Sequence, residues 1–261
     1  MPLKAYIMQQ YRIIIITTPL ILFIANSALA APNMRDNFGH FILKGAAGVA
    51  SLSAGDAELE VVPDFETDDV TFDREDAAII SLGVGYIFPL QYPNYNQLKW
   101  FPSFTTSLDV SYQFETEFSG DVFLFGSSAF LSQNKTEISN TNLIFNIQVN
   151  VAEYQDFSFF ILGGLGPAWT EVKYKDRDSA GQGLTLDNQN NLTLALQAGG
   201  GIGYAITPAL HTMLRYQYTN FGQVETAESG NTSIVPGADI TAAKFDYRQQ
   251  SLLLGLEWHF L

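Results

Sequence analysis

The chain has 261 residues, a formal charge of −14 and no cysteine. An acidic chain is a poor partner for nucleic acid, and the lack of cysteine excludes a disulfide framework, a thiolate metal site and a cysteine nucleophile. Charged residues make up only 15% of the chain, whereas aromatic residues reach 13%. Few charges and many aromatic residues suit a barrel whose outer face touches lipid and whose rims carry aromatic girdles.

Residues 1–30 have the pattern of a secretory signal peptide. Two basic residues precede an apolar run over residues 13–24, and Ala28 and Ala30 form an A-x-A cleavage site. We expect cleavage to leave Ala31 as the mature N-terminus. The alternative is an uncleaved transmembrane anchor, but the run is shorter than the roughly 20 apolar residues that a spanning helix needs.

The remaining residues, 31–261, contain no apolar stretch of helical span length. Membrane insertion of this part therefore requires a closed barrel, in which every backbone hydrogen bond is made between strands. Alternation of apolar with small or polar residues is the pattern of a barrel strand, because successive side chains point to opposite faces. The segments with this pattern are 40–52, 78–88, 104–116, 142–152, 157–171, 191–206, 210–221 and 248–260.

The sequence thus predicts an all-β fold, an eight-stranded antiparallel up-and-down transmembrane β-barrel of an outer membrane. The connections alternate in length, as expected when long loops lie outside and short turns face the periplasm. The exception is 89–103, which is long for a periplasmic turn and rich in proline. The long connections are 53–77, 117–141, 172–190 and 222–247, and the short ones are 153–156 and 207–209.

A soluble sandwich or lipocalin-type barrel would show the same alternation with the apolar face inside. The signal peptide, the aromatic residues at strand ends and the many glycines on the other face favour the membrane barrel. Small residues on that face suit a narrow lumen that side chains fill.

The C-terminal segment resembles the assembly signal of outer-membrane barrels, through Gly255, Trp258 and Phe260. The barrel assembly machinery is therefore an expected partner, together with outer-membrane lipid and lipopolysaccharide. Residues 192–222 are similar to the opacity-type porin and outer-membrane protein A-like transmembrane family. The residues that carry this resemblance are Gln197-Ala198-Gly199, Gly201, Gly203-Tyr204, Thr207-Pro208, Arg215-Tyr216 and Phe221-Gly222.

The resemblance implies a surface-antigen type of barrel and names no ligand. Many members of that family are structural or adhesive. We therefore expect an integral outer-membrane protein that is structural or meets an external host or matrix partner through its loops. The alternative of a different class is a narrow porin for small solutes.

Five charged residues should face the lumen, where buried charges must pair or be neutralised. They are Lys44, Asp109, Glu115, Arg215 and Glu257. We hypothesise an internal ion pair between Arg215 and Glu257, with Lys44 nearby. The pair would serve as a structural plug or as a gate, and filled interiors of small barrels favour the plug.

No enzymatic site, cofactor or metal site is indicated by a motif. Some eight-stranded barrels modify lipid A with a histidine and a serine near the outer rim. Here His40, His211 and His259 lie near strand ends on the predicted periplasmic side, and no His-x-Ser occurs. The glycines of 199–203 lack the strand-then-helix context of a nucleotide loop.

Two long loops have unusual compositions. Residues 53–77 hold ten acidic residues and one basic residue, which indicates a solvated loop, weak divalent-cation binding or attraction of a basic partner. Residues 117–141 contain two apolar clusters. Such clusters mark interaction surfaces, although this segment could instead extend its strands above the membrane or fold over the barrel mouth.

Overall fold

The computed structural model describes residues 39–55, 57–62, 66–90, 98–123, 130–177, 184–232 and 239–260. The predicted signal peptide and its cleavage site lie outside these residues, so both stay predictions. Within the described ranges, no helix is long and apolar enough to cross a membrane.

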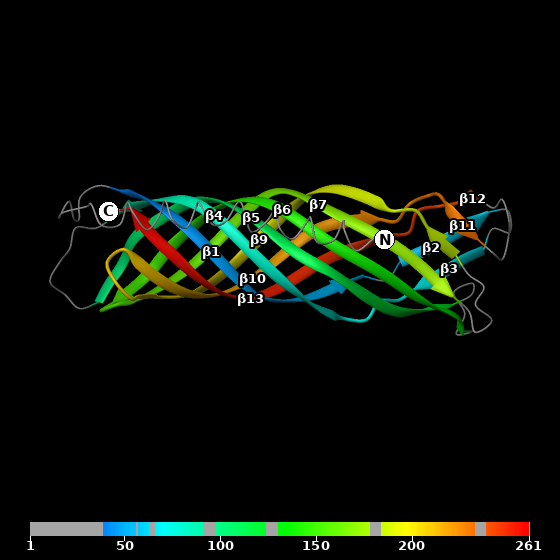
Figure 1. Ribbon diagram of the computed structural model, residues 1–261, viewed down its shortest axis with the longest axis horizontal. Helices are drawn as coiled ribbons and strands as arrows, with labels where there is room; N and C mark the ends of the chain where they lie inside the picture. The colour runs from blue at the N-terminus through cyan, green and yellow to red at the C-terminus, as the bar shows by residue number, and fades with distance from the viewer. Residues whose placement is uncertain are drawn as a thin grey trace, which may run out of the picture.

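Eight long antiparallel strands form a closed ring (Figure 1), in which each strand pairs with its neighbour along the chain and the last returns to the first. The closing register runs from Phe41 opposite Phe260 to Ala54 opposite Tyr247. The predicted eight-stranded barrel is confirmed. Its strands are β1 (His40–Ala54), β4 (Glu75–Pro89), β5 (Leu98–Phe123), β6 (Phe130–Tyr154), β7 (Phe157–Arg177), β9 (Gln189–Ala205), β10 (Leu210–Glu225) and β13 (Lys244–Phe260).

Apolar side chains cover the outside of this ring. On β9, Leu192 is 67% exposed, and on β13, Leu254 is 64% exposed, while the alternate residue Leu253 is fully buried. A water-soluble barrel would place these leucines inside. The outward apolar band therefore identifies the surface that faces lipid, and the closed ring leaves no unpaired strand edge there.

Several strands are far longer than a bilayer requires. β5 has 26 residues, β6 has 25 and β7 has 21, whereas about 9–11 residues cross a membrane. The excess lies at the end with the long connections, which we call the long-loop end. The opposite, short-turn end has the tight connections after β6 and β9. Of the alternatives for 117–141, strand extension is confirmed for residues 117–123 and 130–141; residues 124–129 lie outside the described ranges.

Five short strands add to the long-loop end, and those labelled in Figure 1 gather there. β3 pairs with the tip of β5, and β2 pairs with both β3 and β12. The segment 53–77, expected to be a loop, is thus partly strand. The short strands are β2 (Ala57–Val62), β3 (Glu66–Val70), β8 (Leu184–Leu186), β11 (Gly230–Thr232) and β12 (Asp239–Ile240).

A β-bulge in β5 corrects one predicted orientation. The pairing with β6 skips between Gln113 and Thr116, and the two residues between them, Phe114 and Glu115, are both exposed. One inserted residue moves every later side chain to the opposite face. The prediction that Glu115 faces the lumen is therefore wrong, because this carboxylate lies on the outer surface.

The connection predicted over 89–103 is shorter than expected. β4 continues to Pro89 and β5 begins at Leu98, so part of the predicted loop is strand. The amide of Leu90 donates to the carbonyl of Pro102 at 2.8 Å, which extends the contact between the two strands.

Candidate functional site in the barrel lumen

The lumen at the long-loop end is filled by an aromatic plug, which we define as Phe72, Phe118, Phe221, Phe245 and Tyr247. The rings of Phe221 and Tyr247 stack with centroids 5.0 Å apart, and Phe72 lies 5.0 Å from Phe245. The Tyr247 hydroxyl donates to the side-chain oxygen of Gln113 below the plug. All but Phe72 are fully buried. The extended part of the barrel thus has an apolar core of its own.

Below the plug lies a lumen charge cluster of Lys44, Asp109 and Arg215. The Lys44 ammonium is 3.1 Å from the Asp109 carboxylate, and the Arg215 guanidinium is 3.4 Å from it. Asn146 also donates to Asp109 at 3.0 Å, and Lys44 donates to Ser107 at 2.7 Å. One carboxylate therefore partly compensates the charge of two buried cations, which come from different strands.

Gly83 makes room for this carboxylate. A Cβ placed on Gly83 would lie 2.0 Å from an oxygen of Asp109. The small residues that the alternation places on the inner face thus leave space for polar side chains.

The predicted pair between Arg215 and Glu257 is wrong, and the strand register explains why. In the pairing of β10 with β13, Arg215 of β10 lies opposite Leu253, whereas Glu257 of β13 lies opposite His211. Arg215 instead reaches across the lumen to Asp109 on β5. The structure places four of the five predicted charges inside. Lys44, Asp109 and Arg215 form the cluster, whereas Glu257 lies opposite Lys44 on the neighbouring strand without pairing with it.

At the short-turn end, the lumen opens into a cavity of about 870 Å³. Its lining includes Phe160 and Met213 on the inner side, and Glu257 with the histidines towards the mouth. Nε2 of His259 lies 2.8 Å from the Glu257 carboxylate, and Nδ1 of His259 lies 2.9 Å from Nε2 of His40. We call this hollow the short-turn cavity.

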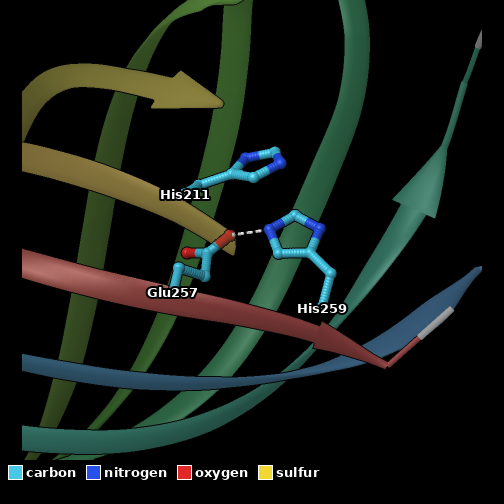
Figure 2. Close-up of side chains that lie close together, drawn as sticks. All are labelled: His211, Glu257 and His259. Carbon is cyan, nitrogen blue, oxygen red and sulfur yellow. Dashed lines mark hydrogen bonds and ion pairs between the residues drawn. The ribbon is translucent and has the colours of Figure 1, made fainter. Parts of the chain in front are cut away.

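The ring of His211 stacks on that of His259, with centroids 4.0 Å apart. Figure 2 shows both rings and the Glu257 carboxylate gathered inside the barrel, with the side chains coming from β10 and β13. The sequence placed each histidine near a strand end of the same side. It did not indicate that they converge, and the one available signal was the spacing of Glu257 and His259, which share a face.

The C-terminal residues of the predicted assembly signal lie at the end of β13. Phe260 is exposed on the outer face, Trp258 is partly exposed there, and Gly255 faces the lumen. A Cβ on Gly255 would lie 2.8 Å from both the Gly45 carbonyl and the Met213 methyl. For the acidic segment 53–77, most carboxylate side chains lie outside the described residues, so cation binding there stays a prediction.

Comparison with solved structures finds other outer-membrane proteins. The Escherichia coli outer membrane protease OmpT is 9% identical with a TM-score of 0.48, and the match covers 87% of this chain and 99% of that one. OprG of Pseudomonas aeruginosa is 15% identical with a TM-score of 0.43, covering 86% and 98%. The attachment invasion locus protein Ail of Yersinia pestis, solved with the heparin analogue sucrose octasulfate, is 10% identical with a TM-score of 0.37, covering 84% and 99%.

No curated protein sequence matches the chain. The expectation that it is not an enzyme stays a prediction. A family model described as the outer membrane protein β-barrel domain matches residues 20–260, in agreement with the closed ring and its apolar outer band. The chain therefore belongs to the outer membrane β-barrel family and is an integral protein of the bacterial outer membrane.

Proposed function

We propose that the chain is a surface protein whose long-loop end projects from the outer membrane and interacts with external partners. The observation that carries this proposal is the extension of β5, β6 and β7 well past the apolar band. A barrel that only crossed the membrane would not need it. The extension forms a stalk that is filled by the aromatic plug, and it is suited to holding loops away from the membrane.

The outer wall of the stalk is charged and internally paired. Lys173 hydrogen bonds to Glu115 and lies 3.7 Å from Glu137 and 3.8 Å from Glu171. The hydrogen bond that the Lys173 ammonium donates to Glu115 raises the pKa of Lys173. Lys135 pairs with Glu117 at 2.5 Å on the same wall. These charged residues begin where the apolar band ends, which supports lipopolysaccharide head groups as their neighbours.

A closed lumen argues against the alternative of a narrow porin. Within the described residues, a solute would have to pass the lumen charge cluster and then the aromatic plug. The short-turn cavity favours a porin, because it opens the lumen at the short-turn end. We therefore keep a channel as the second candidate, and conductance separates the two.

The first test is single-channel recording of the refolded protein in a planar bilayer. If the lumen is closed, we expect no conductance steps from a bilayer in which the presence of folded protein has been verified. Reproducible conductance steps that change in Arg215→Gln would contradict the closed lumen and establish the channel.

The second test addresses the stalk. Residues 120–134 are replaced by an Asn-Gly turn, which joins Ser119 and Lys135 where they already lie opposite each other. We expect the barrel to fold and the bacteria that display it to lose adhesion to extracellular matrix. The matched control changes the turn Gln155-Asp156 at the short-turn end to Asn-Gly and should keep adhesion. Equal adhesion of both variants would contradict an interacting stalk.

A further inference from the structure

We propose that His211, Glu257 and His259 form a binding site for a divalent transition-metal ion of the Zn²⁺ class, at the short-turn mouth of the lumen. One ligand atom from each of the three lies within 4.8 Å of the others. This site is independent of the proposed surface role, because it lies at the opposite end of the barrel.

Barrel closure and register bring these residues together. His211 on β10 lies directly opposite Glu257 on β13, and Cβ atoms of such cross-strand pairs are about 4.5–5.5 Å apart. His259 follows two residues after Glu257, so both side chains point inward. His40, from the start of β1, completes the group, and the chain has only three histidines. All of them meet at this one mouth.

The donor set has the chemistry of a known class of zinc site. Two imidazoles and one carboxylate, with a fourth position left for water, form an open tetrahedral site. Imidazole is also a ligand for copper, iron and nickel, whereas magnesium and calcium prefer oxygen ligands alone. The short-turn cavity borders all three residues, so an ion and its water have a path in.

One neighbour is suited to orient a ligand. His40 lies 2.9 Å from Nδ1 of His259, on the side of the ring away from Glu257. Metal-binding histidines usually engage their second nitrogen in a contact of this kind. The ring of His211 stacks on that of His259, and the short-turn cavity, which both residues line, leaves room for His211 to turn towards an ion.

Glu257 remains available because its cationic neighbour is turned elsewhere. Lys44 lies opposite Glu257 in the pairing of β1 with β13. Its ammonium, however, contacts Ser107 and Asp109 on β5. The Glu257 carboxylate instead contacts Nε2 of His259, so it lies among the imidazoles and forms no ion pair with Lys44.

Cobalt is the probe that tests this site. Untagged, refolded barrel in detergent is titrated with Co²⁺, and the visible bands are recorded together with binding by equilibrium dialysis. We expect one site with the intense bands of four- or five-coordinate Co²⁺, and loss of those bands when Zn²⁺ is added. Surface carboxylates would give only the weak bands of octahedral Co²⁺.

Variants decide which residues hold the ion. His211→Ala and Glu257→Gln should each weaken binding by at least about 10–100-fold, the loss typical of an outer-shell partner, since a direct ligand contributes more. The matched control is Glu153→Gln, another carboxylate that lines the cavity but pairs with Lys99. It should keep the bands. Folded wild type without intense bands, or folded His211→Ala with unchanged bands, would overturn the proposal.

Discussion

Asp109 is the residue on which the charge balance of the lumen depends. It is the shared partner of Lys44 and Arg215, and all three are almost fully buried. Removing one partner of a buried ion pair leaves an uncompensated charge in a medium that solvates it poorly, which costs about 3–5 kcal/mol. The two buried cations are therefore tolerated in the lumen only while this carboxylate is present.

We expect Asp109→Asn to lower the free energy of unfolding by about 3–5 kcal/mol, because two buried cations lose their counter-charge. Urea titration in lipid vesicles, followed by tryptophan fluorescence, measures the change. Glu117→Gln is the control, since that carboxylate is exposed on the stalk and pairs only with Lys135. A loss below about 1 kcal/mol in Asp109→Asn would mean that water, not Asp109, compensates the cations.

Gly222 illustrates a backbone requirement of one residue. It has a φ of 75°, and it follows a bulge where the pairing of β10 with β13 skips Phe221. Its amide donates to the side chain of Asn220 at 2.9 Å. Because a Cβ here would touch nothing within 4 Å, only the left-handed backbone conformation penalises a side chain.

Gly222→Ala should therefore cost about 1–2 kcal/mol of unfolding free energy, through backbone strain alone. Gly222→Asn should cost less, because asparagine tolerates that conformation. The same urea titration checks both. Equal costs for the two substitutions would point to a lost contact rather than to strain.

Among the elements, β5 shows where sequence reasoning stops. Alternation correctly placed Asp109 inside and Leu108 outside. It could not reveal the bulge, because Phe114 and Glu115 continue the alternating pattern while the pairing with β6 shifts by one residue. The orientation of Glu115 is decided by the partner strand, which a single sequence does not show.

The outward position of Glu115 has a measurable consequence. We expect Glu115→Gln to change the free energy of unfolding by no more than about 1 kcal/mol, as exposed ion pairs contribute little. A carboxylate in the lumen would behave like Asp109. A loss of several kcal/mol would support the lumen-facing orientation that the sequence predicted for Glu115, and it would contradict the bulge.

The last strand, β13, closes the ring, and its end carries the predicted assembly signal. Phe260 is exposed beside the end of β1, so removing its ring removes little packing. We expect Phe260→Ala to lower the amount of assembled barrel in cells while the purified protein still folds in detergent. Comparing heat-modifiable, folded protein in membranes and in refolding reactions measures this. An equal loss in both would assign Phe260 to stability instead.

For the whole molecule, the period-two pattern predicted the ring, its strand order and its lipid face, because those depend on local alternation. The partner of Arg215 and the meeting of three histidines depend on how far neighbouring strands are staggered. His40 and His259 are 219 positions apart, and they meet only because the ring closes with a particular register. Neither the composition nor the spacing of residues along the chain predicts that stagger.

The position of the membrane on this long barrel is itself testable. Val84 lies in the middle of the apolar band on β4 and is 56% exposed, so its neighbour should be the bilayer core. Val84→Arg should cost about 2–4 kcal/mol of unfolding free energy in vesicles, the value for arginine at the midplane of a barrel. Ser139→Arg provides the matched control, because Ser139 lies on the stalk opposite Glu171 and should tolerate the charge. If both substitutions cost the same, the bilayer would extend over the stalk, and the loops would lie at the membrane surface rather than above it.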